Sequence, residues 1–315
     1  MFRKAFLLVL IIVFAAFPCL AQQSKTVSTK LESRKLESKL MGRQLSYNVI
    51  LPSGYDVDKT SRFPVLYLLH GLYGRFDDWA MKSNVRENAS GFNFIIVMPE
   101  GENGWYVDSA TDDKNKYESY LMQELIPTID REYRTIDKVN ARAIAGLSMG
   151  GYGSLKFGLK YPEKFGFAAS MSGALNATSF SKDVLARLSF VKDSIDKAYG
   201  EGDTKTRLQN DIFKLVQNLN EGQIKSTPFI YLDCGTEDGL IDTNQNFAKL
   251  LREKKIKYEF RELPGGHDWK YWSKQILEVL QTAQDNLKTP TQTGSTSVMT
   301  TIPTRKINPS IIEAN

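Results

Sequence analysis

The sequence predicts an α/β fold with a mostly parallel sheet and helices on both of its faces. Short apolar, β-branched runs alternate along the chain with segments whose apolar residues recur at helical spacing. Parallel strands need a crossover between them, and strands covered on both faces are continuously apolar. With 315 residues, of which 42% are hydrophobic and 24% charged, the chain is long enough for one large domain of this kind.

The elements follow from these runs in chain order. Strands are expected at 45–51, 64–69, 94–98, 141–145, 167–171, 229–233 and 258–261. Helical patterns lie at 117–125, 247–251 and 272–287, and another helix is expected to begin near Gly153. The stretch 179–227 is long, polar and helical in pattern, which predicts an insertion over the sheet edge where the carboxyl ends of the strands meet. Proteins of this class bind their ligands at that edge.

The first 21 residues are typical of a secretory signal peptide. A basic start is followed by an apolar run at 5–17, whose 13 residues are fewer than the roughly 20 that a membrane-spanning helix needs. Small residues at Cys19 and Ala21 predict cleavage after Ala21, and hence a secreted or periplasmic protein without stable membrane insertion. An uncleaved anchor is the alternative, and a lipid anchor is disfavoured because Pro18 precedes Cys19.

The domain is therefore expected to span 22–287. From residue 288 to 315 the chain is rich in Thr, Ser and Pro and keeps no helical or strand period, which predicts a disordered tail.

Composition excludes several kinds of protein. The chain has two histidines, His70 and His267, and two cysteines, Cys19 and Cys234, and none of them falls at the spacing of zinc ligands. We expect no metal and no cofactor, and no disulfide, since signal cleavage leaves Cys234 alone. The formal charge of +5 falls to about +3 without the signal, and no dense basic block indicates nucleic-acid binding.

The motif G-L-S-M-G-G at 146–151 follows a predicted strand directly and precedes a predicted helix. In this context G-x-S-x-G forms a sharp turn that exposes the serine hydroxyl at the top of the sheet. Ser148 is then a nucleophile, and the N–H of Met149 points toward a negative oxygen forming beside it. The alternative is a glycine-rich turn in which Ser148 only caps the helix.

A serine hydroxyl needs a base, and histidine is the usual one near neutral pH. In the α/β-hydrolase order the nucleophile precedes the acid and the acid precedes the histidine, which His267 satisfies and His70 does not. The H-G-x-x-G sequence at 70–74 has the pattern of an oxyanion loop, whose donor would be the N–H of Leu72. We expect His70 to be a scaffold residue hydrogen-bonded under that loop.

The third member must orient the imidazole, and it is expected on the loop after the strand at 229–233. The candidates are Asp233, Glu237, Asp238 and Asp242. Asp238 is favoured because it lies a few residues past the strand end between glycines, and Glu237 is second. Asp268 directly follows the base and is expected to fix its loop.

Aromatic residues surround these positions. The segment 100–106 follows a predicted strand and should face the serine, so it is expected to line the substrate pocket. The expected pocket residues are Trp105 and Tyr106 from this segment, together with the neighbouring aromatic residues Tyr152 and Trp269. Cys234 is expected to pack at the end of its strand.

The pattern resembles the α/β-hydrolase esterase family that includes S-formylglutathione hydrolases, feruloyl and acetylxylan esterases, tributyrin-type and enterochelin esterases, and mycolyltransferases. The matching segments are 68–72, 105–107, 124–127, 146–151, 234–238 and 266–269, in family order. The resemblance implies Ser148 as nucleophile, Asp238 as acid, His267 as base, and Leu72 and Met149 as oxyanion amides. The glutathione-linked branch is cytosolic, so the signal segment disfavours formylglutathione as substrate.

The function expected from these features is a secreted serine carboxylesterase that acts on a small-molecule ester through an acyl-enzyme. The residues are equally compatible with an acyltransferase, in which a sugar or glycerol-like alcohol replaces water as acceptor. A non-enzymatic binding module would be expected to lack a triad member, and a metallohydrolase would need more ligands than two histidines and one thiol. The acyl and alcohol groups and the oligomeric state stay open.

Overall fold

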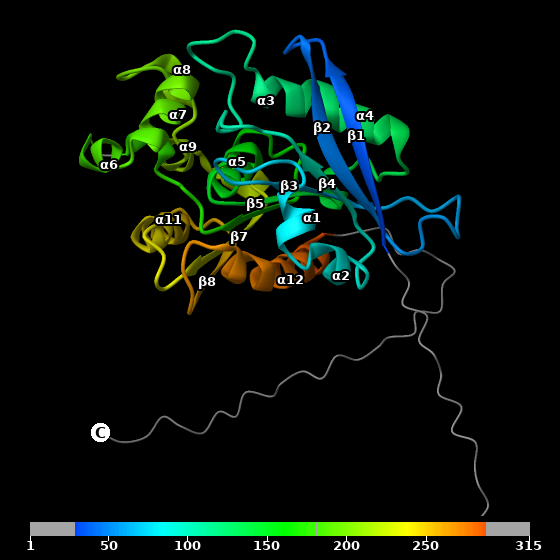
Figure 1. Cartoon of the computed structure of the whole chain (residues 1–315). Helices are drawn as coiled ribbons and strands as arrows, with labels where there is room; N and C mark the ends of the chain where they lie inside the picture. The colour runs from blue at the N-terminus through cyan, green and yellow to red at the C-terminus, as the bar shows by residue number, and fades with distance from the viewer. Residues whose placement is uncertain (1–28, 181, 288–315) are drawn as a thin grey trace, which may run out of the picture.

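The computed structural model describes residues 29–180 and 182–287 (Figure 1). Within these residues, eight strands form one sheet in the order β1-β2-β4-β3-β5-β6-β7-β8. Their bounds are β1 Lys30–Ser38, β2 Arg43–Leu51, β3 Val65–Leu69, β4 Ile95–Pro99, β5 Arg142–Leu147, β6 Phe167–Met171, β7 Phe229–Gly235 and β8 Tyr258–Leu263. The expected signal at 1–21 and tail at 288–315 lie outside the described residues.

The mostly parallel sheet predicted from the sequence is confirmed. From β4 through β3 to β8 each strand pairs in parallel with its neighbour. β2 pairs antiparallel with β4, and β1 pairs antiparallel with β2 along its whole length. Strand β1 was missed in the sequence analysis, because its residues are mostly polar and exposed and form no apolar run. This segment is a strand because it pairs with β2, which the local sequence does not indicate.

Helices cover both faces of the sheet, as expected. Their bounds are α1 Asp78–Lys82, α2 Val85–Ala89, α3 Tyr117–Ser119, η1 Tyr120–Leu125, α4 Ile126–Glu132, η2 Val139–Ala141, α5 Met149–Lys160, η3 Ala177–Ser179, α6 Lys182–Arg187, α7 Ser189–Tyr199, α8 Lys205–Gln209, α9 Ile212–Gln217, α10 Glu221–Ser226, α11 Ile241–Glu253 and α12 Trp269–Asn286. Helix α5 begins at Met149, four residues earlier than expected, because it follows the turn at Ser148 directly.

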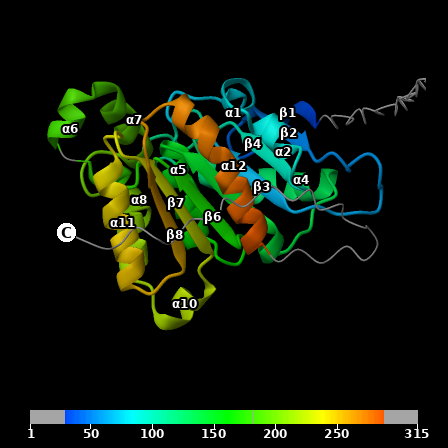
Figure 2. The same ribbon diagram turned by 90° about the horizontal axis from the view of Figure 1, so that it is seen from below.

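Two apolar cores result from the alternation of side chains along the strands. In β3, Tyr67 and Leu69 face the core that holds α4, α5, α9 and α11, whereas Leu66 and Leu68 face the core that holds α1, α2 and α12. Figure 2 shows α12 lying across its face of the sheet. The site described below is therefore carried on a sheet that is packed on both sides.

The region 179–227 forms the predicted helical insertion, from α6 to α10. Figure 1 shows α6, α7 and α8 gathered on the side of the molecule away from β1 and β2. Phe180, Leu188 and Val191 from this region line a cavity together with Ser148, which places the insertion over the carboxyl ends of the strands.

Candidate active site

Ser148 lies in the tight turn between β5 and α5. Its backbone has φ +53° and ψ −117°, a left-handed conformation that costs energy in any residue with a Cβ. The turn directs the side chain out of the sheet instead of continuing the strand. This is the strained geometry that the G-x-S-x-G motif predicts.

Close backbone contacts around the turn require glycine. A Cβ at Gly146 would lie 2.5 Å from the carbonyl carbon of Gly150, and a Cβ at Gly150 would lie 2.6 Å from the backbone oxygens of both Leu69 and His70. The first turn of α5 is thereby packed directly against the ends of β5 and β3. This packing brings the Ser148 turn beside the loop that starts at His70.

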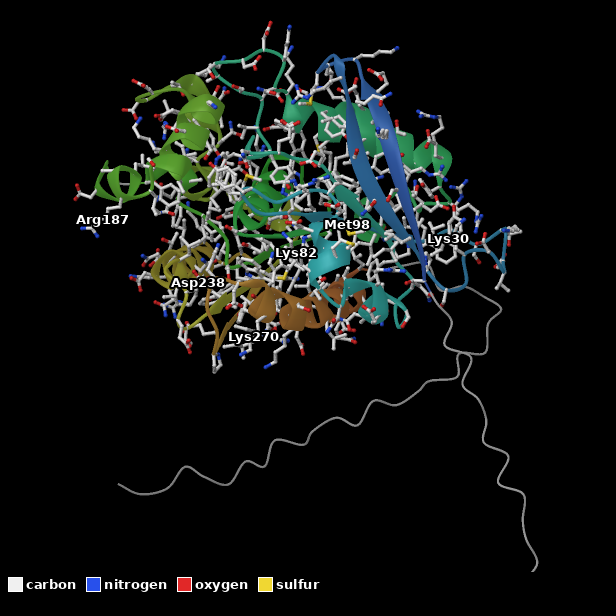
Figure 3. All side chains as sticks on the ribbon, in the orientation of Figure 1. Lys30, Lys82, Met98, Arg187, Asp238 and Lys270 are labelled. Carbon is white, nitrogen blue, oxygen red and sulfur yellow. The ribbon has the colours of Figure 1, made fainter. Side chains whose placement is uncertain are left out.

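His267 and Asp238 meet Ser148 from two other loops. The Nε2 atom of His267 lies 2.9 Å from Ser148 Oγ, and its Nδ1 atom lies 2.8 Å from Asp238 Oδ2. Asp238 follows β7 and precedes α11 (Figure 3), and its other oxygen accepts the N–H of Leu240 at 2.9 Å. The ring of His267 packs edge-on against Trp272, with 4.9 Å between ring centroids. The structure thus brings together the three residues predicted as a triad.

Asp238 is held as a carboxylate. Burial acts to raise its pKa, but the hydrogen bond and the charge of His267 outweigh this effect together with the Leu240 N–H, so the pKa lies below its ordinary value. Its side chain is 1% exposed and that of His267 is 37% exposed. A buried fixed charge behind a partly open imidazole can stabilise the protonated ring while the ring still reaches a substrate.

Among the described residues, none of the other acid candidates bonds His267. Asp233 is buried inside β7, and burial raises the pKa of its carboxyl to about 8. Glu237 and Asp242 are exposed. Asp268 caps α12 by accepting the Tyr271 N–H at 2.9 Å, which agrees with the loop-fixing role expected for it. Within the described residues, Asp238 is the carboxylate that bonds His267.

The loop at 70–74 lies beside the serine. A Cβ built on Gly71 would lie 3.4 Å from Ser148 Cβ, so the Gly71–Leu72 peptide adjoins the reacting hydroxyl. In the part of the chain that the structure describes, the N–H groups of Leu72 and Met149 donate to no other protein group. Two free backbone donors beside a serine are what an oxyanion requires.

His70 determines how the Gly71–Leu72 peptide is turned. Its Nδ1 lies 2.8 Å from the Gly71 carbonyl oxygen, which also accepts the Gly74 N–H at 3.0 Å. In a planar trans peptide the N–H points opposite to the C=O, so these two bonds direct the Leu72 N–H the other way. His70 is therefore hydrogen-bonded under the loop, as expected from the sequence.

Glu100 completes the surroundings of His70. Its Oε1 lies 3.1 Å from His70 Nε2, and its oxygens accept the N–H groups of Phe76 and Glu102. Burial acts to raise the pKa of Glu100, but the bond and charge of His70 and these two N–H groups bring it below its ordinary value.

A cavity of about 770 Å³ opens at Ser148. Two of the four expected pocket residues, Trp105 and Trp269, line it. Tyr106 and Tyr152 do not, so their prediction as pocket residues is wrong: both are fully buried, and their hydroxyls donate to the carbonyls of His70 and Asn210. Their positions after β4 and in α5 are near the serine, but the side chains turn into the core.

The sequence reasoning missed part of the cavity wall. Apolar side chains from the insertion line one part, namely Phe180, Leu188 and Val191, and Asp78 and Lys82 of α1 line another. A second cavity of about 620 Å³ lies within the insertion, and Phe180 lines both. The sequence indicated the contribution of the insertion only in general terms, by predicting that 179–227 lies over the sheet edge at which ligands bind. Among the described residues, no three His, Cys, Asp or Glu side chains are grouped so that they could hold a metal ion.

Similarity to known esterases extends over most of the chain. The family model described as "Putative esterase" matches residues 38–283. An acetyl esterase from Caldicellulosiruptor saccharolyticus is 31% identical over 72% of this chain and 85% of its own length. Esterase Rv1288 from Mycobacterium tuberculosis is 29% identical over 74% of this chain, which spans 54% of that protein.

Solved structures of an esterase and of a serine hydrolase also align with most of this chain. A ferulic acid esterase aligns with a TM-score of 0.70 and 29% identity, over 82% of this chain and 99% of its own. The fluorophosphonate-binding serine hydrolase FphF of Staphylococcus aureus aligns with a TM-score of 0.71 and 24% identity, over 81% and 98%. The α/β-hydrolase fold class predicted from the sequence is thereby confirmed.

Proposed function

Because this chain belongs to the esterase family and is a serine hydrolase acting on ester bonds, we propose that it cleaves small carboxylic esters through an acyl-enzyme on Ser148. The observation that carries the proposal is the 2.9 Å contact between Ser148 Oγ and His267 Nε2, backed by the 2.8 Å contact between His267 Nδ1 and Asp238. A serine hydroxyl with such a base is an activated nucleophile.

In the acylation step, Ser148 Oγ attacks the carbonyl carbon of the ester while its proton passes to His267 Nε2. The carbonyl oxygen becomes an oxyanion, which accepts hydrogen bonds from the N–H groups of Leu72 and Met149. His267 then gives the proton to the leaving alcohol oxygen as the C–O bond breaks. Loss of one such oxyanion donor typically lowers kcat by about 10²- to 10³-fold.

In the deacylation step, a water molecule replaces the alcohol. His267 takes a proton from this water as its oxygen attacks the acyl carbon, and the same two N–H groups bind the second oxyanion. The proton returns to Ser148 Oγ when the carboxylic acid leaves. Asp238 keeps its charge throughout and stabilises the imidazolium of His267 in both steps.

Substitution of the nucleophile tests this proposal. In the purified protein, Ser148→Ala is expected to abolish hydrolysis of p-nitrophenyl acetate and butyrate while leaving the thermal midpoint nearly unchanged. Ser226→Ala, on the exposed helix α10, is the matched control and should retain full activity. Undiminished hydrolysis in Ser148→Ala would exclude Ser148 as the nucleophile.

Acyl transfer is the second candidate for the same site. A mycolyltransferase named Diacylglycerol acyltransferase/mycolyltransferase Ag85A, from Mycobacterium leprae, is 27% identical over 71% of this chain. The triad acts identically in both reactions, so product analysis must separate them. Glycerol added to an ester assay should yield acylglycerol if transfer competes with hydrolysis, and only the free acid if it does not.

We also propose export through a cleaved signal at residues 1–21. The described helices include none that is long and apolar enough to cross a bilayer. Expression of the full chain with its leader should yield an exported protein whose first residue is Gln22 by N-terminal mass spectrometry. Recovery of the chain with Met1 intact would contradict cleavage.

A further inference from the structure

A set of buried polar side chains lies behind the 70–74 loop and takes no part in the proposed chemistry. It runs from Glu118 in α3 through Lys156 in α5 to Tyr106 in the segment after β4, and ends on the backbone of His70. None of these three side chains lines the cavity at Ser148. Their contacts nevertheless lead to the peptide that carries the Leu72 N–H.

Lys156 and Glu118 form a buried ion pair at 2.5 Å. Glu118 also contacts Lys160 at 2.6 Å and accepts the Tyr161 hydroxyl at 2.7 Å. Burial lowers the pKa of Lys156 to about 8. An apolar pair of similar volume is often no less stable than a buried ion pair, so stability alone does not account for these charges. What an apolar pair could not supply is the donor that Lys156 Nζ directs at the carbonyl oxygen of Tyr106.

That carbonyl belongs to a strained turn. Trp105 and Tyr106 have φ values of +51° and +55°, and both side chains are buried. Left-handed backbone in such residues persists only where the surroundings hold it. Here the Tyr106 ring fills space that only glycine leaves free: a Cβ at Gly101 or Gly153 would lie 2.4 or 2.7 Å from the ring. Lys156 therefore holds the backbone of the turn at the Tyr106 carbonyl, and packing against Gly101 and Gly153 holds the Tyr106 ring.

The Tyr106 side chain contacts the oxyanion loop with its hydroxyl and with its ring, whose centroid lies 5.8 Å from that of His70. The Tyr106 hydroxyl donates to the His70 carbonyl oxygen at 3.0 Å, and the His70 ring holds the next carbonyl, that of Gly71, at 2.8 Å. The two side chains that hold these consecutive carbonyls, Tyr106 and His70, do not line the cavity. The N–H of Leu72 belongs to the second of these peptides and must point the other way.

We propose that Tyr106 and the Lys156–Glu118 pair are positioning residues for the oxyanion hole. They hold the Gly71–Leu72 peptide in the orientation in which its N–H meets the oxyanion, and they contact neither the substrate nor the reacting atoms. The inference rests on the proposed function, since it concerns the donor used in both of its steps.

Tyr106→Phe tests the link with the smallest change, because it removes one hydroxyl and keeps the ring. We expect kcat for p-nitrophenyl acetate to fall about tenfold with KM within about twofold, the pattern of a lost transition-state interaction. Tyr120→Phe is the matched control: this tyrosine is equally buried, and its hydroxyl has no hydrogen-bond partner among the described residues. It should leave both constants unchanged.

A trifluoromethyl ketone gives a readout that a purely structural role would not move, since it binds serine as a tetrahedral oxyanion. Its inhibition constant should rise in Tyr106→Phe by the factor by which kcat/KM falls, and it should rise in Lys156→Met also. Equal inhibition constants in Tyr106→Phe, Tyr120→Phe and the unmodified protein would overturn the inference. The Tyr106→Phe result decides the matter if Lys156→Met does not fold.

Failure of this inference is distinguishable from failure of the proposed function. If Ser148→Ala keeps its activity, the proposed nucleophile is wrong and the assay no longer reports on Leu72. If Ser148→Ala is inactive while Tyr106→Phe matches Tyr120→Phe in kcat and in inhibition, the function stands and the positioning role is wrong.

Discussion

Substitution of Asp238 by Asn is the most informative single change at the site. It keeps the size of the side chain and the acceptor for the Leu240 N–H, which lies at 2.9 Å. It places an NH₂ donor where Oδ2 now faces His267 Nδ1 at 2.8 Å. To accept from that donor, Nδ1 must give up its proton, and the proton then moves to Nε2. Nε2 faces Ser148 Oγ at 2.9 Å and can no longer accept the proton of the nucleophile.

The expected loss follows from this change of tautomer. The hydroxyl loses its base and the imidazolium loses its counter-charge, which together typically lower kcat by about 10⁴-fold. That factor corresponds to about 5.5 kcal/mol of transition-state stabilisation. Substrate binding should change little, because the carboxylate is buried behind the ring, so KM is expected to stay within about threefold.

The assay is steady-state hydrolysis of p-nitrophenyl acetate by Asp238→Asn and Glu237→Gln. Glu237 is the neighbouring exposed carboxylate and the second candidate from the sequence, so its substitution should leave kcat within about twofold. A large loss in Glu237→Gln with little loss in Asp238→Asn would refute the assignment of the acid and the tautomer argument with it.

Three further changes test other parts of the structure. Gly150→Ala places a Cβ 2.6 Å from the backbone oxygens of Leu69 and His70, so it should separate the serine turn from the oxyanion loop and lower kcat by about 10²-fold. Gly54→Ala, whose Cβ would meet nothing within 4 Å and which does not line the cavity at Ser148, should have no effect, and equal kcat values in the two would contradict this account. Phe180→Ala removes a wall shared by the two cavities, so kcat/KM for p-nitrophenyl octanoate relative to acetate should rise about tenfold; an unchanged ratio would show that acyl chains do not pass this way. The pKa of Asp233 is about 8 in the folded protein, against an ordinary value of 3.8. As pH rises from 4 to 8, the carboxyl ionises in the unfolded chain but stays protonated in the folded one. The free energy of unfolding therefore falls by at most about 1.4 kcal/mol per pH unit. The thermal midpoint of Asp233→Asn minus that of the unmodified protein should therefore increase from pH 5 to pH 8 in scanning fluorimetry, whereas a constant difference would mean that the carboxyl does not titrate in this range.

The parts of the fold that could be predicted are those whose burial is encoded locally. Strands β3 to β7 are nearly continuous apolar runs, because both of their faces are covered. Strand β1 could not be found in this way, since its alternating charges are compatible with any exposed segment. Its existence depends on pairing with β2, which is a long-range property of the folded sheet.

The site shows the same division. Chain order and glycine spacing predict Ser148, Asp238 and His267 as a set, and the structure brings these side chains within hydrogen-bond distance, because each lies on a loop or turn that follows a strand. The direction of a side chain leaves no comparable signal. Tyr106 was expected in the pocket, but its side chain is buried in the core, where its hydroxyl donates to the His70 carbonyl oxygen. The complete burial of Lys156 depends on Glu118, a partner 38 residues away that no local pattern connects to it.

The central claim is that Ser148 is the residue that carries the acyl group, and covalent labelling tests it most directly. The purified protein is treated with a fluorophosphonate until ester hydrolysis stops, then digested and analysed by mass spectrometry. We predict one phosphonyl group per chain, on Ser148, and no labelling in Ser148→Ala. A modification on any other residue at complete inhibition, or continued hydrolysis with Ser148 fully modified, would contradict the account.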